Sequence, residues 1–318
     1  MVSIIFLRKI VKQNEKFLHF LCELWHNVKM KYLKIEIDGI TQKKNIYKFL
    51  RENNFSEHYI SALRNNLDNI LINGKPTNVR GTLKNGDVLE IAKNPYKATE
   101  IELIEKPLNI VYEDDDYLVI NKPPLLATTP TRSHYTDNLS GMICAYMKKK
   151  DDNFTLRIMN RLDKDASGLI LVAKDAIAYQ KTVNIKKEYY AICHGILKDV
   201  KVVDTPILTL QENGINIMKR VCDERGQNAK TTLTPIKTLK DKTLVKAEIE
   251  KGRTHQIRLH SSSIGHALIG DKIYGIYDEF SHTYLFLKKI SFENTKSCKK
   301  YAFDLELPSE FLDLIKHK

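Results

Sequence analysis

The stretch Asn160-Arg161-Leu162-Asp163-Lys164-Asp165-Ala166-Ser167-Gly168-Leu169 decides how this chain of 318 residues is interpreted. Asp163 follows a basic and an apolar residue and precedes a turn of small residues. Residues 169–173 are a continuous apolar run, which predicts a buried strand. A carboxylate in such a basic setting suits a nucleophile or an electrostatic stabiliser. A turn aspartate that only accepts backbone hydrogen bonds would look the same, so the other segments have to decide.

A second polar segment, Glu250-Lys251-Gly252-Arg253-Thr254-His255-Gln256-Ile257-Arg258-Leu259-His260, places two Arg and two His within eight residues. Ile257 and Leu259 alternate with Arg258, which predicts a short strand over residues 255–260. An arginine held beside a carboxylate fixes its direction through paired hydrogen bonds. A solvated basic face is the alternative interpretation. We expect no metal site, because neither His has a Cys or carboxylate at ligand spacing.

Two further segments look structural when taken alone. The segment Lys187-Glu188-Tyr189-Tyr190-Ala191-Ile192-Cys193-His194-Gly195 predicts a strand that ends in a glycine turn. A tyrosine there is equally suited to fill the core. The segment Ile120-Asn121-Lys122-Pro123-Pro124-Leu125-Leu126 predicts a strand exit stiffened by two prolines.

Together these segments resemble the RluA-type family of pseudouridine synthases, which isomerise uridine within RNA. The resemblance covers roughly residues 108 to 310, with four motifs in the family's order. The Arg-Leu-Asp motif and its Ser-Gly turn are matched by Arg161, Leu162, Asp163, Ser167 and Gly168. The later motifs are matched by Lys187, Tyr189 and Ala191, by Gly252, Arg253, His255, Gln256, Ile257, Arg258 and His260, and by Gly270-Asp271 and Tyr274-Gly275. Asn160 stands where many relatives carry His.

The resemblance implies a cofactor-free isomerase that flips the target nucleotide out of its helix. It implies that Asp163 is the nucleophile or charge stabiliser, that Arg258 orients it and that Tyr189 stacks on the uracil. Whether Asp163 attacks the sugar or assists a glycal route stays open. The residues expected to bind substrate are Arg161, Lys187, Arg253, His255, Gln256 and Lys122. Arg161 is expected to fill the gap left by the flipped base.

The resemblance also implies an α+β catalytic domain over residues 108–318, with a bisected mixed or antiparallel sheet and a central cleft. Short strands are predicted at residues 110–113, 117–121, 168–173, 188–194, 229–238, 243–250 and 255–260. Helices are predicted at residues 139–148 and 176–186. The polar residues 204–228 are expected to form an arm over RNA.

Residues 30–95 predict a small module of two helices and a short sheet, with Ser56 as an N-cap and a hairpin through Asn73-Gly74. This module resembles the alpha-L RNA-binding domain, similar to one in a ribosomal small-subunit protein. Its expected RNA-facing residues are Lys43, Lys44, Lys48, Arg51 and Arg64. Residues 96–107 are the expected linker. Residues 1–29 are expected to be an upstream extension, with Met30 as the natural start.

The composition agrees with RNA as the partner. The chain has 51 Lys and Arg against 39 Asp and Glu, and this excess favours phosphate backbones. Five Cys without a CxxC pair favour a reducing cytoplasm, and no apolar segment is long enough to span a membrane. We expect a monomer acting on ribosomal RNA, with transfer RNA as the other candidate. A non-catalytic ribosome-assembly protein on the same fold and a base-releasing hydrolase remain alternatives.

Overall fold

The computed structural model describes residues 32–39, 43–96, 100–131, 134–150, 154–212 and 215–316, and it divides into two compact units. The described part of unit 1, the N-terminal module, consists of residues 32–96 together with Asp175–Gln180. Unit 2 contains the remaining residues from 100 onwards; we call it the catalytic unit because it holds the motifs of the catalytic domain that the resemblance implies. The expected extension over residues 1–29 lies outside the described residues. The combination of helices with a large mixed sheet confirms the predicted α+β class.

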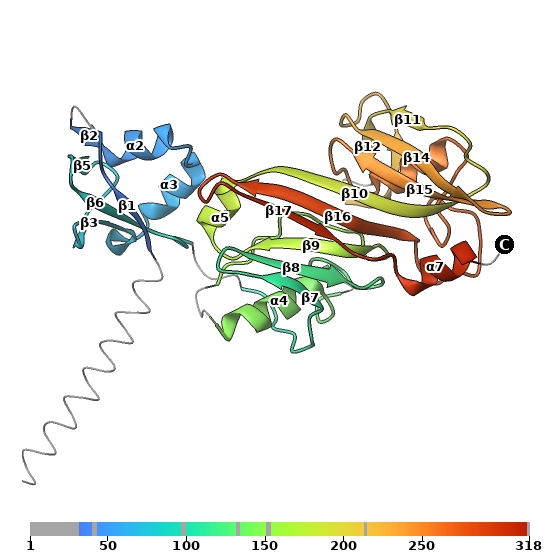
Figure 1. Cartoon of the computed structure of the whole chain (residues 1–318), viewed down its shortest axis with the longest axis horizontal. Helices are drawn as coiled ribbons and strands as arrows, with labels where there is room; N and C mark the ends of the chain where they lie inside the picture. Colours follow the sequence, from blue (N-terminus) through green and yellow to red (C-terminus); the bar gives the residue numbers. More distant parts are fainter. Residues whose placement is uncertain are drawn as a thin grey trace, which may run out of the picture. The chain divides into compact units, whose positions relative to one another are not determined.

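The catalytic unit is built on one long twisted sheet (Figure 1). Its strands are β7 (Ile110–Glu113), β8 (Tyr117–Lys122), β9 (Ser167–Ala173), β10 (Thr182–His194), β11 (Lys201–Asp204), β14 (Lys230–Thr238), β15 (Lys242–Ile249), β16 (Leu285–Asn294) and β17 (Lys299–Asp304). The order is β11-β14-β15-β10-β16-β9-β8-β7, with β17 paired to β16. Six of the seven predicted strands are therefore present, with bounds shifted by a few residues.

The sheet changes character where β9 meets β16. These two strands are parallel and pair only through Ser167 with Phe286 and Gly168 with Leu287, whereas the other neighbours are antiparallel. Gly168 has a φ of +113°, and a Cβ there would lie 2.4 Å from the Leu287 carbonyl oxygen. Only glycine permits this approach. The loop that carries Asp163 therefore enters the middle of the sheet at this junction.

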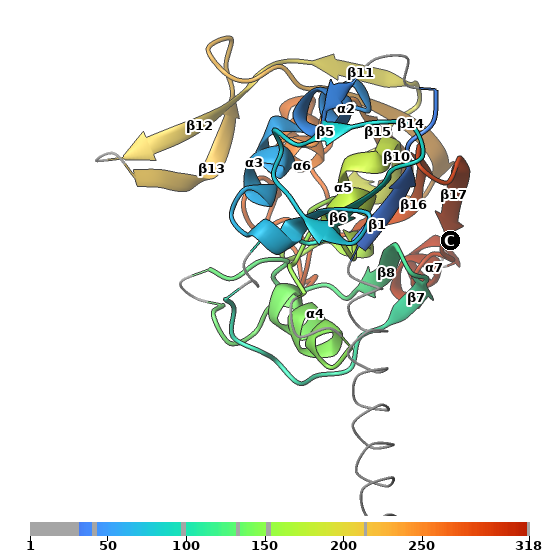
Figure 2. The same cartoon turned by 90° about the vertical axis from the view of Figure 1, so that its left-hand side faces the viewer.

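Helices α4 (Leu139–Lys148), α6 (Gln256–Ser263) and α7 (Ser309–Lys316) complete the catalytic unit. The predicted strand over residues 255–260 is wrong, because these residues begin helix α6. All residues from Gln256 to Ser261 are buried, so an alternation of apolar and polar residues carries no information about period there. Strands β12 (Ile207–Glu212) and β13 (Ile215–Cys222) form a separate hairpin within the expected arm, and Figure 2 shows it projecting from its unit.

The helix predicted over residues 176–186 is only partly correct. Helix α5 (Ala176–Lys181) ends early, and Thr182 already belongs to β10. The β-branched Thr182, Val183 and Ile185 favour a strand. Asn184 has a φ of +55°, and a β-bulge lies between Val183 and Lys186. The local backbone therefore follows strand pairing with β16 instead of continuing the helix.

The N-terminal module contains a four-stranded sheet and two short helices. The sheet order is β1 (Tyr32–Glu36), β6 (Val88–Ala92), β3 (Ile70–Ile72) and β4 (Lys75–Pro76), and β2 (Lys44–Asn45) pairs separately with β5 (Thr82–Leu83). Helices α2 (Ile46–Glu52) and α3 (Glu57–Leu63) and the 3-10 turn η1 (Leu67–Asn69) complete it. Ser56 caps α3 by accepting a bond from the Tyr59 N–H, as predicted. Ala176 and Ile177 of α5 are buried in the same core.

Candidate active site

A cavity of about 310 Å³ in the catalytic unit collects most of the predicted site residues. It is bounded by the loop before β9, by β10 and by the segment that leads into α6. Eight predicted residues line it: Arg161, Asp163, Lys187, Tyr189, Arg253, His255, Gln256 and Arg258. Lys122 is the predicted residue of this unit that does not line it. Segments almost one hundred residues apart in sequence therefore meet at one place.

The Asp163 loop is held by two buried polar side chains, those of Asn160 and Thr128. Asn160 donates to the Leu169 carbonyl at 3.0 Å and accepts from the Leu171 N–H at 2.8 Å, which ties the loop to β9. The Thr128 hydroxyl donates to the Leu162 carbonyl at 2.6 Å. Buried polar groups that are fully bonded hold a backbone in one conformation. The loop thus presents the Asp163 side chain, 23% exposed, to the cavity.

Arg258 lies between two carboxylates. Its Nη1 donates to Oδ2 of Asp163 at 3.2 Å, while its Nε and Nη2 donate to the two oxygens of Asp271 at 2.7 Å each. The Arg258 side chain is 2% exposed and that of Asp271 is fully buried. The paired bond to Asp271 fixes the plane of the guanidinium group. The remaining Nη1 therefore points at Asp163 in a defined direction.

The charges of this cluster are strongly coupled. Burial alone would lower the pKa of Arg258, but the hydrogen bonds and charges of Asp271 and Asp163 outweigh burial and raise it. Burial raises the pKa of Asp271, and the bonds from Arg258 and from two backbone N–H groups outweigh this and lower it. Arg258 and Asp271 therefore form an ion pair at neutral pH, and the third nitrogen of the guanidinium group is directed at Asp163.

Tyr189 lies in the middle of β10, between Ala247 of β15 and Leu287 of β16. It is 5% exposed and lines the same cavity as Asp163. Burial, with a further contribution from the Asp163 charge, raises the pKa of the Tyr189 hydroxyl well above its ordinary value of 10. The side chain is therefore a neutral aromatic ring at physiological pH.

His255 faces Asp163 from the other side. Its backbone has a φ of +58°, a left-handed conformation that is uncommon for a residue with a side chain. Its Nε2 lies 4.0 Å from Oδ2 of Asp163, and its Nδ1 lies 3.0 Å from the Tyr274 hydroxyl. The Tyr274 oxygen accepts the Arg220 N–H of β13 at 2.7 Å, so its own proton is available for Nδ1. Burial lowers the pKa of His255, and the ring is neutral at pH 7.

The other lining residues differ in how much of their polar surface is free. Arg161 is exposed, and Lys187 is half-buried with no ion pair among the described residues. Arg253 donates from Nε to the Asn228 carbonyl at 3.2 Å. Both amide hydrogens of Gln256 are used, on the Lys230 carbonyl at 2.9 Å and the Thr231 hydroxyl at 3.1 Å. Gln256 therefore joins α6 to β14 and has no donor left for a substrate.

The prediction that Lys122 contacts the substrate is wrong. Its side chain is fully buried, and Nζ donates to the carbonyls of Pro123 and Leu126 at 2.8 Å and of Lys164 at 3.2 Å. Burial lowers the pKa of Lys122 to about 7, while the nearby Asp163 and Asp165 charges act in the opposite direction. Three carbonyls require the three donors of an ammonium group. Lys122 holds the Asp163 loop in place and does not reach the cavity.

The predicted RNA-facing residues of the N-terminal module are also unequal. Lys44 pairs with Glu52, and Arg51 donates to the Phe55 carbonyl at 2.8 Å. Lys43 and Lys48 are exposed, without a partner among the described residues. Arg64 alone of the five lines a cavity, which is a second one of about 520 Å³ within this module.

Asp271 and Tyr274 complete the site, although neither was assigned a role from the sequence. Their segment, Gly270-Asp271-x-x-Tyr274-Gly275, follows α6 in the chain and was identified only as one of the motifs of the family resemblance. Asp271 also accepts the N–H groups of Ile273 and Tyr274, so the same turn carries both side chains. Among the described residues there is no group of three metal-ligating side chains and no helix long and apolar enough to cross a membrane.

The chain is similar to known proteins. The sequence profile described as RNA pseudouridylate synthase matches residues 116–263. The "Uncharacterized RNA pseudouridine synthase YjbO" of Bacillus subtilis is 32% identical over 280 residues, which are 85% of this chain and 98% of that protein. The "Ribosomal large subunit pseudouridine synthase D" of Zymomonas mobilis is 31% identical over 283 residues, 80% of this chain and 88% of that protein. A solved structure, "Human RNA Pseudouridylate Synthase Domain Containing 4", shares the fold with a TM-score of 0.50 and 21% identity, covering 64% of this chain and 90% of that one.

Proposed function

Because this chain belongs to the family of RNA pseudouridine synthases, we propose that the cavity around Asp163 is where it isomerises uridine to pseudouridine. The chain is an isomerase that acts on RNA. The observation that carries the assignment of the site is the Asp163 carboxylate, partly exposed in the cavity and oriented by a fully buried Arg258. A carboxylate with a fixed direction is what attack on, or stabilisation of, a ribose carbon requires.

The reaction conserves every atom of the nucleotide. The bond between N1 of uracil and C1′ of ribose breaks, the base turns, and C5 bonds to C1′. A proton leaves C5 and one is gained at N1, so no redox partner or group donor takes part. In one route the Asp163 carboxylate bonds to C1′ as N1 leaves. In the other it accepts the C2′ proton as uracil leaves, which forms a glycal, and this proton returns to C2′ when C5 bonds to C1′. In the first route the Asp163 carboxylate is released when the C5–C1′ bond forms, and it can then accept the C5 proton.

The lining side chains suit a uridine that has been flipped out of its helix. The neutral ring of Tyr189 offers a face for the uracil, as aromatic side chains do for unstacked bases. Its raised pKa keeps the hydroxyl protonated, so Tyr189 cannot act as a base, and we assign its ring to stacking on the uracil. The exposed Arg161 sits at the cavity edge, where it can fill the space that the base leaves. Lys187 and Arg253 supply positive charge for the flanking phosphates.

We assign ribosomal RNA as the substrate. The support is the name of the Zymomonas mobilis relative, a ribosomal large subunit pseudouridine synthase, and of a Haemophilus influenzae relative with the same name, which is 32% identical over 230 residues. The N-terminal module is assigned to RNA binding, on the basis of its free basic residues and its resemblance to the alpha-L domain. A ribosomal substrate and a net charge of +12 fit a cytoplasmic monomer that binds its RNA electrostatically.

The test of the site is Asp163→Asn in the full chain. Tritium at C5 of uridine is released to water when C5 loses its hydrogen, so release from [5-³H]uridine-labelled ribosomal RNA measures turnover. We expect a loss of at least about 10³-fold, because the amide has the same shape but no nucleophilic charge. RNA affinity should change little. Asp165→Asn is the matched control, since Asp165 lies in the same loop and does not line the cavity.

Normal tritium release by Asp163→Asn would remove Asp163 from the reaction. Release of free uracil by the unaltered chain would identify a hydrolase. RNA binding without either product would leave only the ribosome-assembly interpretation. Labelled transfer RNA, assayed in parallel, decides between the two substrate classes.

A further inference from the structure

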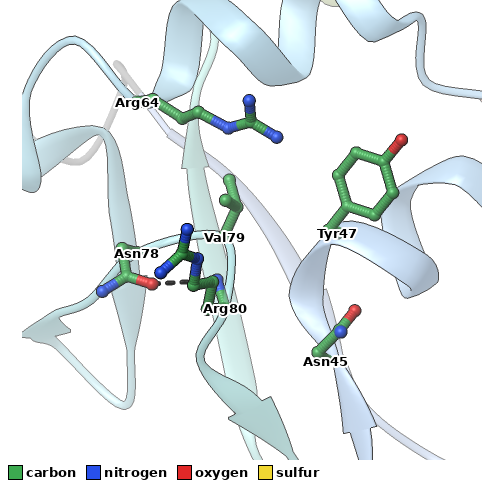
Figure 3. A pocket seen from close by; sticks show the side chains of 6 residues that line it. All are labelled: Asn45, Tyr47, Arg64, Asn78, Val79 and Arg80. Carbon is green, nitrogen blue, oxygen red and sulfur yellow. Dashed lines mark hydrogen bonds between the residues drawn. The ribbon is translucent and has the colours of Figure 1, made fainter.

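The second cavity, about 520 Å³ within the N-terminal module, combines apolar surface with positive charge. It is lined by Asn45, Tyr47, Arg64, Asn78, Val79 and Arg80, which come from β2, α2, the end of α3 and the loop before β5 (Figure 3). The two charged lining residues are both arginines, and no carboxylate lines the cavity. Such a site favours an anion.

The lining amides present donors and not acceptors. The Asn45 oxygen accepts the Lys48 N–H at 2.7 Å, and the Asn78 oxygen accepts the Arg80 N–H at 2.9 Å. Both oxygens are thus used by the local backbone, whereas neither NH₂ group has a partner among the described residues. The free polar surface therefore consists of amide and guanidinium N–H groups, which match the acceptor oxygens of a phosphate.

The two arginines differ in whether their guanidinium groups already have a partner. Arg80 is exposed and forms no ion pair with any described residue. Arg64 lies 4.0 Å from Glu57, at the limit of an ion pair, and its guanidinium lies 5.8 Å from the centre of the Tyr47 ring. In Figure 3 the Arg64 side chain extends toward this ring. Tyr47 is half-buried, and its hydroxyl donates to Glu57 at 2.8 Å, which holds the ring in place.

We infer that this cavity, the Arg64–Arg80 pocket, binds one nucleotide of the RNA strand outside the catalytic cavity. Arg80 and Arg64 bind its phosphate, and its base stacks on Tyr47. A guanidinium group binds phosphate through paired N–H bonds, and base stacking on an aromatic ring tolerates any sequence. The inference rests on RNA as the substrate of the proposed function. The pocket shares Arg64 with the RNA-facing residues expected from the sequence, which stay a prediction.

The test compares Arg80→Gln with Lys75→Gln in the full chain. Lys75 is exposed in the same module and does not line the pocket, so both variants lose one charge. The probe is a fluorescein-labelled stem-loop RNA with a single-stranded extension, titrated at several salt concentrations. The slope of log affinity against log salt should fall by about 0.7–0.9 for Arg80→Gln and stay unchanged for Lys75→Gln. Tyr47→Leu should weaken binding about fivefold or more without changing the slope.

Equal slopes for the two charge variants would overturn the phosphate assignment, and an unchanged affinity of Tyr47→Leu would overturn the stacking. Inorganic phosphate at equal ionic strength should not displace the probe. Displacement that disappears in Arg80→Gln would identify a free-phosphate site and overturn the RNA assignment. Tritium release from a minimal stem-loop is measured for the unaltered chain and for Lys75→Gln, and we expect the two to be equal. If Arg80→Gln and Tyr47→Leu bind RNA like the unaltered chain while the unaltered chain turns over, this inference alone is overturned. Absence of turnover in the unaltered chain would contradict the proposed function.

Discussion

Arg258 in the catalytic unit and Arg80 in the N-terminal module carry the same guanidinium group in opposite settings. Arg258 is 2% exposed and bonds to two carboxylates, whereas Arg80 is exposed and pairs with none among the described residues. A buried pair keeps its geometry because breaking it leaves a charge without solvent. An exposed arginine keeps its charge available for a ligand. The same residue type therefore suits two tasks. Arg258 orients the Asp163 carboxylate, and Arg80 is placed to attract an anionic ligand.

This comparison separates what limits catalysis from what limits binding. The charge of Arg258 is already neutralised inside the protein, so it adds little to the long-range attraction of RNA. The charge of Arg80 is free to replace counterions at a phosphate, which makes its contribution sensitive to salt. Substitutions in the catalytic unit should act on stability and kcat, and substitutions in the module should act on affinity.

The largest effect is expected for Asp271→Asn. The substitution keeps the shape but removes the charge that is paired with Arg258 at 2.7 Å. Breaking a buried pair costs about 3–5 kcal/mol of unfolding free energy. Hydrogen–deuterium exchange of the β9 amides, which reports unfolding of the catalytic unit, should become much faster. The kcat for tritium release should fall because Asp163 loses a fixed partner, while RNA affinity should hold.

Arg80→Gln, which alters the exposed arginine of the N-terminal module, is the comparison variant for Asp271→Asn. It should leave both β9 exchange and kcat at saturating RNA unaltered. If Asp271→Asn also leaves both unaltered, Asp271 does not position Arg258, and the contrast between the two arginines fails.

The site was predictable from sequence because its parts lie in short, continuous motifs. Asp163, Tyr189 and Arg258 each occur in a segment whose local residues also set the backbone, so the segments identify the side chains before the fold is known. Gly168 illustrates the reason, because the turn after Asp163 must approach β16 closely and admits only glycine. Eight predicted residues accordingly line one cavity.

The failures have a common physical cause, which is burial of polar residues by partners distant in sequence. Residues 255–260 alternate like a strand, but Arg258 and His260 are buried in a helix because Asp271 and Thr231 satisfy them. Lys122 looks like a substrate ligand, yet its three carbonyl partners lie inside the protein. Helix α5 contributes Ala176 and Ile177 to the core of the N-terminal module.

Deleting residues 1–95 would expose these two residues of helix α5. Point substitutions are therefore the sounder test of whether the N-terminal module binds RNA.

A smaller effect is expected from the pH dependence of stability at His255. Its pKa is lowered by burial, with Arg258 and Arg220 adding to this and Asp163 and Asp271 opposing it. Between the lowered pKa and the ordinary value of 6.5, the unfolded chain binds more protons than the folded chain. The unfolding free energy should therefore fall as the pH drops through this window.

Exchange of the β9 amides at pH 7 and at about pH 5, corrected for intrinsic rates, measures this loss. His255→Gln should lose less protection on acidification than the unaltered chain. His58→Gln, which replaces an exposed histidine of the N-terminal module, should match the unaltered chain. Identical pH dependence in all three would show that folding does not lower the pKa of His255, and this contribution to the pH dependence of stability would then be absent.

The smallest effect, and the one of opposite sign, is expected for Glu57→Gln. The Glu57 carboxylate lies 4.0 Å from Arg64 and competes with an RNA phosphate for it. Glutamine still accepts the Tyr47 hydroxyl, so the ring keeps its position while Arg64 is released. Because exposed ion pairs contribute about 0.2–1 kcal/mol, RNA affinity should rise by about 1.4- to 5-fold at low salt. Glu36→Gln, which removes the same charge from an exposed site of β1, measures the general electrostatic gain. A gain no larger than that of Glu36→Gln would mean that Arg64 does not contact RNA, and Arg80 would then be the sole phosphate ligand of the pocket.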